Sequence, residues 1–306
     1  ETYLGRIGRL AAERRCRVPP AIVFEGNVPA DPGANPLLHE VLSAPSCPAS
    51  THAPRAWLGA AVAIKDPTAA EFPRQSGSNV LLVGHREDLG RVVTPTGLVS
   101  LAAQDPPGTG GAGADGARFY ILDGMPPDAS EAGFWQRVAD AVPHAVTVAL
   151  PRDTKAVIGE VAEEVARRQQ TGQEDAPPVY LCIYGLGRFR DLRRAEDDFG
   201  FSRVDDDKPA SPAQQFAMIL REGPLLGVHT LLWCDTYNNV SNTLDRQGVR
   251  EMEMRVLFQM NATDSSNLID STAAAQLGVH RAVLYNEGLG HVEKFRPYRP
   301  PSAEWL

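Results

Sequence analysis

The chain has 306 residues, of which 43% are hydrophobic, which is enough to bury the core of one large α/β domain or two small ones. The formal net charge of −8 argues against a nucleic-acid binder that tracks phosphates with a basic face. The sequence contains no run of about 18 apolar residues, so none of its segments has the pattern of a membrane-spanning helix.

The first predicted element is a helix over residues 1–16, where Leu4, Ile7 and Leu10 recur at helical spacing. Residues 19–54 are rich in Pro, Ala and Ser, which predicts an extended connection with one helical turn at Pro36–Ser43. The chain begins at Glu1 without a methionine and shows no secretory leader. We therefore expect an excised part of a longer polypeptide that works in the cytoplasm.

Beyond this arm, apolar segments of strand length alternate with segments of helical period. In residues 155–170, Val157, Val161 and Val165 form one apolar stripe, and residues 212–221 repeat the pattern after a predicted N-cap at Ser211. The last strand candidate alternates in polarity, which is typical of an edge strand. The strand candidates are 79–84, 118–123, 145–150, 179–184, 229–234, 254–260, 281–285 and 290–295.

Strands that are apolar throughout and are separated by amphipathic helices predict a mostly parallel sheet covered on both faces. The expected fold class is α/β, as one doubly wound domain preceded by a helical and extended N-terminal arm. The predicted divisions are an arm at 1–55, the α/β domain at 56–300 and a tail at 301–306.

The loop after the first central strand occupies the position of a phosphate-binding loop. That loop needs the pattern GxxxxGK[ST], in which glycines free backbone N–H groups, lysine neutralises phosphate charge and the hydroxyl binds magnesium. Counting from Gly84 puts leucine, glycine and arginine at the places of the second glycine, the lysine and the hydroxyl. Two acidic residues would also repel phosphate. The residues at this degenerate position are Gly84, His85, Arg86, Glu87, Asp88, Leu89, Gly90 and Arg91.

A second position required for ATP hydrolysis is also altered. In P-loop ATPases a strand beside the phosphate-loop strand ends in a carboxylate that holds magnesium. The strand at 179–184 ends instead in Tyr184, followed by Gly185, and a tyrosine does not replace a carboxylate at a magnesium site. The sequence therefore predicts no catalytic residue, no metal site and no cofactor in this chain.

Two further segments have unusual compositions. The glycine-rich segment 108–116 precedes a strand, whereas a dinucleotide-binding glycine motif must follow one, so we interpret it as a linker. The segment 188–208 mixes arginines with runs of aspartate, which is more typical of a solvated charged loop than of a metal or partner site.

The order of these elements resembles the FtsK/SpoIIIE branch of RecA-like ATPases, which includes DNA translocases and type VII secretion ATPases of the EccC kind. The resemblance is carried by "GSNVLLVG" at the first central strand, by "GVHTLLWCDT" at 227–236 and by "DSSNLID" at 264–270. It covers about residues 57–298. The resemblance implies a RecA-like domain of the HerA/FtsK group, and partners among other ATPase domains of the same polypeptide or oligomer.

The departures from the family pattern imply a degenerate member. A glutamine that motor relatives often carry after the late strand is replaced around Asp235 and Thr236. Arg255 matches an arginine that lies near a neighbouring subunit's nucleotide in motor relatives. It is accordingly a candidate arginine finger, and a structural ion pair is the alternative.

Two functions follow from this resemblance. The first is a pseudo-ATPase domain, part of a larger translocase-like protein, that serves assembly, docking of a partner or peptide substrate, or regulation of active ATPase domains. DNA would then be contacted only through the full-length protein. The alternative is an active ATP-driven DNA or protein translocase motor that uses ATP and Mg²⁺, with Arg86 or Arg91 in place of the lysine.

Overall fold

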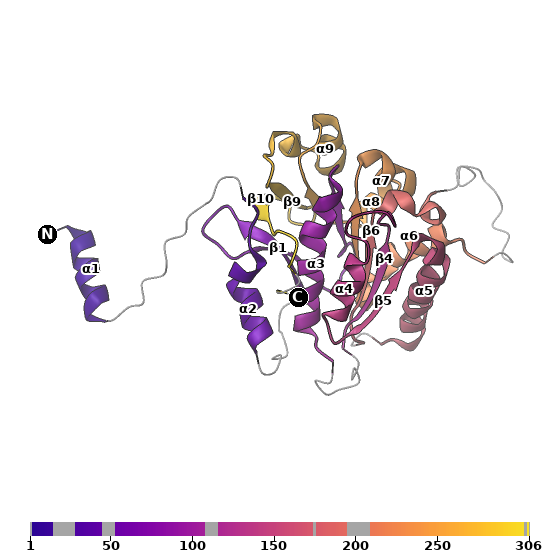
Figure 1. Cartoon of the computed structure of the whole chain (residues 1–306), viewed down its shortest axis with the longest axis horizontal. Coiled ribbons are helices and arrows are strands. Elements are labelled where there is room, and N and C mark those ends of the chain that lie inside the picture. Colours follow the sequence, from indigo (N-terminus) through magenta and orange to yellow (C-terminus); the bar gives the residue numbers. More distant parts are fainter. Residues whose placement is uncertain are drawn as a thin grey trace.

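The computed structural model describes residues 2–14, 28–44, 53–107, 116–173, 176–194, 209–302 and 305, with the backbone alone at 87–89. These residues form a ten-stranded sheet flanked by helices (Figure 1). In spatial order the strands are β2 (Thr68–Glu71), β1 (Arg55–Ala61), β10 (His291–Pro297), β9 (Ala282–Asn286), β8 (Met254–Leu257), β3 (Val80–Val83), β7 (Val228–Cys234), β6 (Val179–Tyr184), β4 (Arg118–Asp123) and β5 (Ala145–Ala149).

The sheet has a parallel half and an antiparallel half. The strands from β8 to β5 are parallel, and β9, β10, β1 and β2 extend the sheet as antiparallel strands. The α/β doubly wound class is confirmed. The prediction that 290–295 form an edge strand holds for His291–Lys294, which pair with β9 alone, whereas Phe295–Pro297 pair with β1.

Helices cover both faces of the parallel half and bury two cores. Apolar side chains of α5 and α6 pack on one face, and those of α3 and α4 pack on the other. The helices are α1 (Tyr3–Glu13), α2 (Pro36–Ser43), α3 (Glu87–Gln104), α4 (Phe134–Asp140), α5 (Thr154–Thr171), α6 (Pro212–Glu222), α7 (Tyr237–Thr243), α8 (Arg246–Arg250) and α9 (Ala262–Ile269). Within the described ranges no helix is both long and apolar enough to cross a bilayer.

Part of the predicted arm packs against the sheet. A third, smaller cluster joins Ala30 and Leu38 to Trp57 and Tyr298, so α2 covers the antiparallel half. Helix α1 has no buried residue and lies apart from the sheet in Figure 1.

The central strand β3 is fixed in place by the asparagine that precedes it. The side-chain amide of Asn79 donates to the carbonyl oxygens of Leu220 (3.0 Å) and Glu251 (2.8 Å), and its carbonyl oxygen accepts the Thr230 N–H (2.8 Å). Because all three contacts are buried, they tie β3 to α6, β7 and the segment before β8.

Candidate functional site

The candidate site lies at the carboxyl ends of β3, β4, β6 and β7, where ligands bind in open α/β sheets. Strand β3 ends at Val83 and α3 begins at Glu87. Only Gly84, His85 and Arg86 connect them. In a phosphate-binding loop, four residues separate the first glycine from the second, and the lysine follows at the start of the helix. The three-residue connection found here is shorter than this loop, so it is too short to wrap a phosphate.

Two stacked aromatic rings lie under the first turns of α3. The rings of Tyr184 and Trp233 stack with centroids 4.6 Å apart, and the two residues are 5% and 3% exposed. A Cβ on Gly90 would lie 2.6 Å from the Trp233 ring and 2.7 Å from the Tyr184 ring. Gly90 therefore allows α3 to pack directly on the rings. The absence of a side chain at Gly90 is thus required by packing.

The prediction that the strand ending in Tyr184 lies beside the phosphate-loop strand is wrong. β7 separates β3 from β6, and Tyr184 reaches the loop position through its stacking on Trp233 of β7. Sequence order could not reveal this crossover, because β7 follows β6 in the chain but is inserted between β6 and β3 in the sheet. Gly185 follows with a positive φ of 81° and donates its N–H to the Trp233 carbonyl oxygen (3.2 Å).

The two arginines at the loop position, Arg86 and Arg91, have surroundings other than those of a phosphate-binding site. Arg91 forms an ion pair with Glu131 at 3.6 Å, which directs it to the segment before α4. Arg86 borders an apolar pocket next to the loop. The side chains of Glu87, Asp88 and Leu89 lie outside the described residues.

Other polar groups at this edge are engaged within the chain. The Asp123 carboxylate, beside Tyr184 in the sheet, accepts the Met125 N–H at 2.8 Å, and burial raises the pKa of this carboxyl group. The Cys234 thiol at the end of β7 has its pKa raised to about 12 by burial, so it stays protonated and is a poor nucleophile.

Arg255 is held by partners inside the chain. It is 5% exposed and donates to the carbonyl oxygens of Leu268 and Val249, each at 2.9 Å. It also pairs with Glu287 and lies 5.6 Å from the centre of the Tyr285 ring. These contacts favour the structural ion pair over the arginine finger, because a buried guanidinium with three partners cannot extend toward another subunit.

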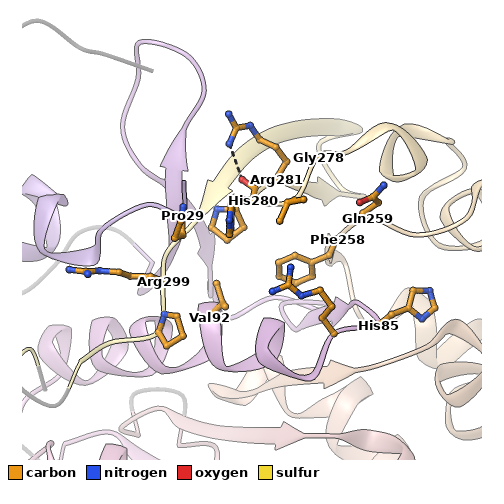
Figure 2. A pocket seen from close by; sticks show the side chains of 13 residues that line it. Pro29, His85, Val92, Phe258, Gln259, Gly278, His280, Arg281 and Arg299 are labelled. Atoms are coloured by element: carbon orange, nitrogen blue, oxygen red, sulfur yellow. Dashed lines mark hydrogen bonds between the residues drawn. The ribbon is translucent and has the colours of Figure 1, made fainter. Parts of the chain in front are cut away.

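Two cavities flank the loop of residues 84–86. The first, which we call the apolar pocket, has a volume of about 410 Å³ and lies between α3, the end of β8 and the segment before β9. Figure 2 shows Val92, Phe258 and His280 converging on it, whereas Arg299 points outward. Its ionisable side chains are all basic: His85, Arg86, His280, Arg281 and Arg299.

The second cavity, which we call the arginine cavity, has a volume of about 580 Å³. It lies on the other side of the loop, above Tyr184 and Trp233. Sequence analysis missed it, because the arginines of 188–193 were interpreted as part of a solvated loop. Its ionisable lining residues are His85, Arg188, Arg190, Arg193 and Asp235. The rest of the segment 188–208, from 195 onward, and the glycines 108–115 lie outside the described residues.

Magnesium and ATP do not fit the described residues of this edge. The loop has no lysine or hydroxyl residue, β6 ends in a tyrosine rather than a carboxylate, and aromatic rings fill the space under Gly90. Among the residues that the structure describes, no three His, Cys, Asp or Glu side chains gather as metal ligands would.

The chain was compared with protein-family models and with curated proteins, and neither comparison gave a match. Solved structures do match. The conjugation coupling protein TcpA of pCW3, in a monomer form with ATPγS, superposes with a TM-score of 0.58 at 13% identity, covering 86% of this chain and 73% of that one.

Two multidomain secretion ATPases are similar as well. The cytoplasmic domain of the type VII secretion ATPase EccC from Thermomonospora curvata gives a TM-score of 0.59 at 14% identity, covering 89% of this chain and 32% of that one. EssC (ATPases 2 and 3) from Geobacillus thermodenitrificans gives 0.58 at 12% identity, covering 91% and 48%. The chain thus spans 32% and 48% of the length of these two secretion ATPases. Its fold is that of the FtsK/SpoIIIE-like, RecA-type ATPase domains in coupling proteins and type VII secretion ATPases.

Proposed function

We propose that this chain is a catalytically degenerate ATPase domain that works by docking, assembly or regulation together with active ATPase domains. The single observation that carries the proposal is the three-residue connection from β3 to α3, closed beneath by the Tyr184–Trp233 pair against Gly90. A triphosphate needs a cradle of backbone N–H groups at this place. The short connection and the rings packed under Gly90 support the proposal that this edge forms no such cradle.

The similar structures support the choice of partners. One is described as containing ATPases 2 and 3 of one protein, so domains of this fold do occur side by side in one polypeptide. We infer that the partners of this chain are other ATPase domains of the same polypeptide or oligomer. Two similar structures are described as cytoplasmic domains, which supports a cytoplasmic place of action.

The apolar pocket is the docking cavity in this proposal. It is concave and mainly apolar with a few polar groups at its border, which suits a peptide or small ligand. Because its ionisable lining residues are basic, the favoured occupant carries an apolar group next to a negative charge.

An anionic aromatic dye, anilinonaphthalene sulfonate, is a direct probe of this pocket. Val279 lies on the rim and is 54% exposed, so Val279→Glu adds repulsion without disturbing the core. We expect about threefold weaker dye binding, since one charge pair near a surface contributes about 1 kcal/mol or less. Val292→Glu, on β10 and 40% exposed, is the matched control and should bind the dye as the wild type does.

A measurement of ATP hydrolysis tests the proposal that the chain has no ATPase activity of its own. The chain alone should release phosphate from Mg·ATP no faster than buffer does. Release that disappears in the Arg91→Ala variant would establish the alternative, an active motor that uses an arginine in place of the lysine.

A further inference from the structure

The two outermost strands of the ten-stranded sheet differ in how open their outer edges are. β2, at one edge, has several of the features that keep an edge strand from pairing further. It is four residues long, and its pairing with β1 shifts register between Trp57 and Gly59. It follows Pro67 directly and ends in Glu71, whose carboxylate forms an ion pair with Arg55. The edge at β2 is thus protected against a further strand.

β5, at the opposite edge, has none of these protections among the described residues. Its five residues include no charge and no proline, and they form an unbroken parallel ladder with β4 alone. An edge strand presents backbone N–H and C=O groups along its outer side, where a further strand can bind them. Ala145 and Thr147 are exposed, and the adjoining Leu150 is 39% exposed. β5 therefore has the properties of a strand that pairs with another chain.

The sequence of β5 is the same in both directions. It reads Ala-Val-Thr-Val-Ala with Thr147 at the centre, and a proline stands at each end of the longer segment 143–151. In an antiparallel pair of two such strands centred on Thr147, alanine would face alanine, valine would face valine and threonine would face threonine. Threonine pairs and pairs of β-branched residues are favourable neighbours across strands. The segment 143–151 contains no Asp, Glu, Lys or Arg, so no like charges would meet.

The two faces of such a pair match as well. Val146 and Val148 are half-buried and pack against the core cluster under α3 and α4, so paired valines would continue this apolar layer into the second copy. Ala145 and Thr147 are on the opposite face, because side chains alternate along a strand. A shift by one residue would set valine opposite threonine or alanine and break this continuity.

We propose that β5 is a self-association site, at which two copies of this chain pair their β5 strands antiparallel about a two-fold axis at Thr147. A two-fold contact uses the same surface on both copies, and a self-complementary strand meets this requirement. The matched side chains favour a second copy over an unrelated extended peptide, which would share the backbone hydrogen bonds alone. The contact goes beyond the proposed function and is independent of the loop at 84–86, because three strands separate β5 from β3.

Sedimentation equilibrium of the whole chain tests this pairing. A five-residue edge buries less surface than a standard interface, so the 33.1 kDa monomer should dimerise with a Kd on the order of tens of micromolar. Thr147→Lys and Thr147→Glu each place like charges opposite each other at the axis, and each should weaken dimerisation at least about tenfold. An equimolar mixture of the two variants places lysine opposite glutamate, so its affinity should return to within about threefold of the wild type.

The matched controls are Thr263→Lys and Thr263→Glu, which make the same changes at an exposed threonine of α9 and should dimerise as the wild type does. A wild type that stays monomeric up to about ten times the expected Kd would overturn the proposal and leave the edge to a strand of another protein. Dimerisation of each Thr147 variant at wild-type affinity would place the contact elsewhere. A mixture as weak as either variant alone, or equal weakening in the Thr263 controls, would also contradict pairing at Thr147.

Discussion

At the scale of single residues, Gly90 lies in the segment where a phosphate-binding loop was sought, and its observed contacts are packing contacts. A side chain at this position would meet two rings that are themselves fixed by stacking. The rings cannot move aside as the end of a flexible side chain could. The glycine is therefore required by the contact between α3 and the sheet.

Gly90→Ala should lower the free energy of unfolding by about 1–3 kcal/mol, because overpacking outweighs the helical preference of alanine. Gly159→Ala is the matched control, since Gly159 lies in α5 and a Cβ there meets nothing within 4 Å. That change should stabilise by about 0.5–1 kcal/mol. Urea unfolding of both variants measures the difference, and equal effects would contradict the packing described for Gly90.

His229 gives a prediction about pH. Its ring lies beside Tyr180 with Nδ1 2.8 Å from the Ser78 carbonyl oxygen, and burial lowers its pKa from 6.5 to about 4. Between these values the unfolded chain binds more protons than the folded chain. Stability should therefore fall as pH drops below 6.5 and reach its full penalty, on the order of 3 kcal/mol, near pH 4.

The pH dependence can be assigned by substitution. His229→Gln removes the titrating group, so its free energy of unfolding should fall less between pH 7.5 and 4.5 than that of the wild type. The exposed His39→Gln serves as a control and should leave the pH dependence unchanged. If both variants kept the wild-type slope, His229 would not be the buried neutral group described above.

At the scale of elements, the sequence patterns located the apolar strands well but not their neighbours in space. Strands β3 and β6 consist of apolar and aromatic residues, and β7 departs from this only at His229 and Thr230, so the buried strands are visible in sequence. The strands β1 and β2 were not predicted, because alanines, a glycine and charged residues dilute their apolar pattern. At the site, the lack of a lysine and a hydroxyl residue in the loop after Gly84 could be predicted from the residue types alone. The aromatic pair and the arginine cavity were not, because both depend on the order of strands in the sheet.

Arg255 connects four elements, and its removal should be felt by the isolated chain. It joins β8 to α9 through Leu268, to α8 through Val249 and to the β9–β10 hairpin through Glu287. Arg255→Ala should lower the free energy of unfolding by about 3–5 kcal/mol, because it leaves buried carbonyl oxygens unpaired. Chemical unfolding measures this loss. An unchanged stability, together with a lower ATPase rate in an assembly with active domains, would return Arg255 to the arginine-finger role.

At the scale of the whole molecule, the fold does not depend on the residues that would bind a nucleotide. The RecA-like sheet is stabilised by apolar strands and two covered faces, which do not depend on the residues that bind phosphate. A domain can therefore lose its nucleotide site and keep its surface for assembly. The apolar pocket and the arginine cavity both border the loop of residues 84–86, and His85 lines both.

Binding of Mg·ATP to the purified chain tests the central claim most directly. A ligand at a hundred times its Kd stabilises a protein by about 2.7 kcal/mol, which a thermal unfolding scan or calorimetric titration resolves readily. An intact P-loop ATPase measured alongside confirms that the conditions support binding. We predict no saturable heat and no shift in Tm for this chain at millimolar Mg·ATP. A saturable heat with a matching rise in Tm would contradict the account.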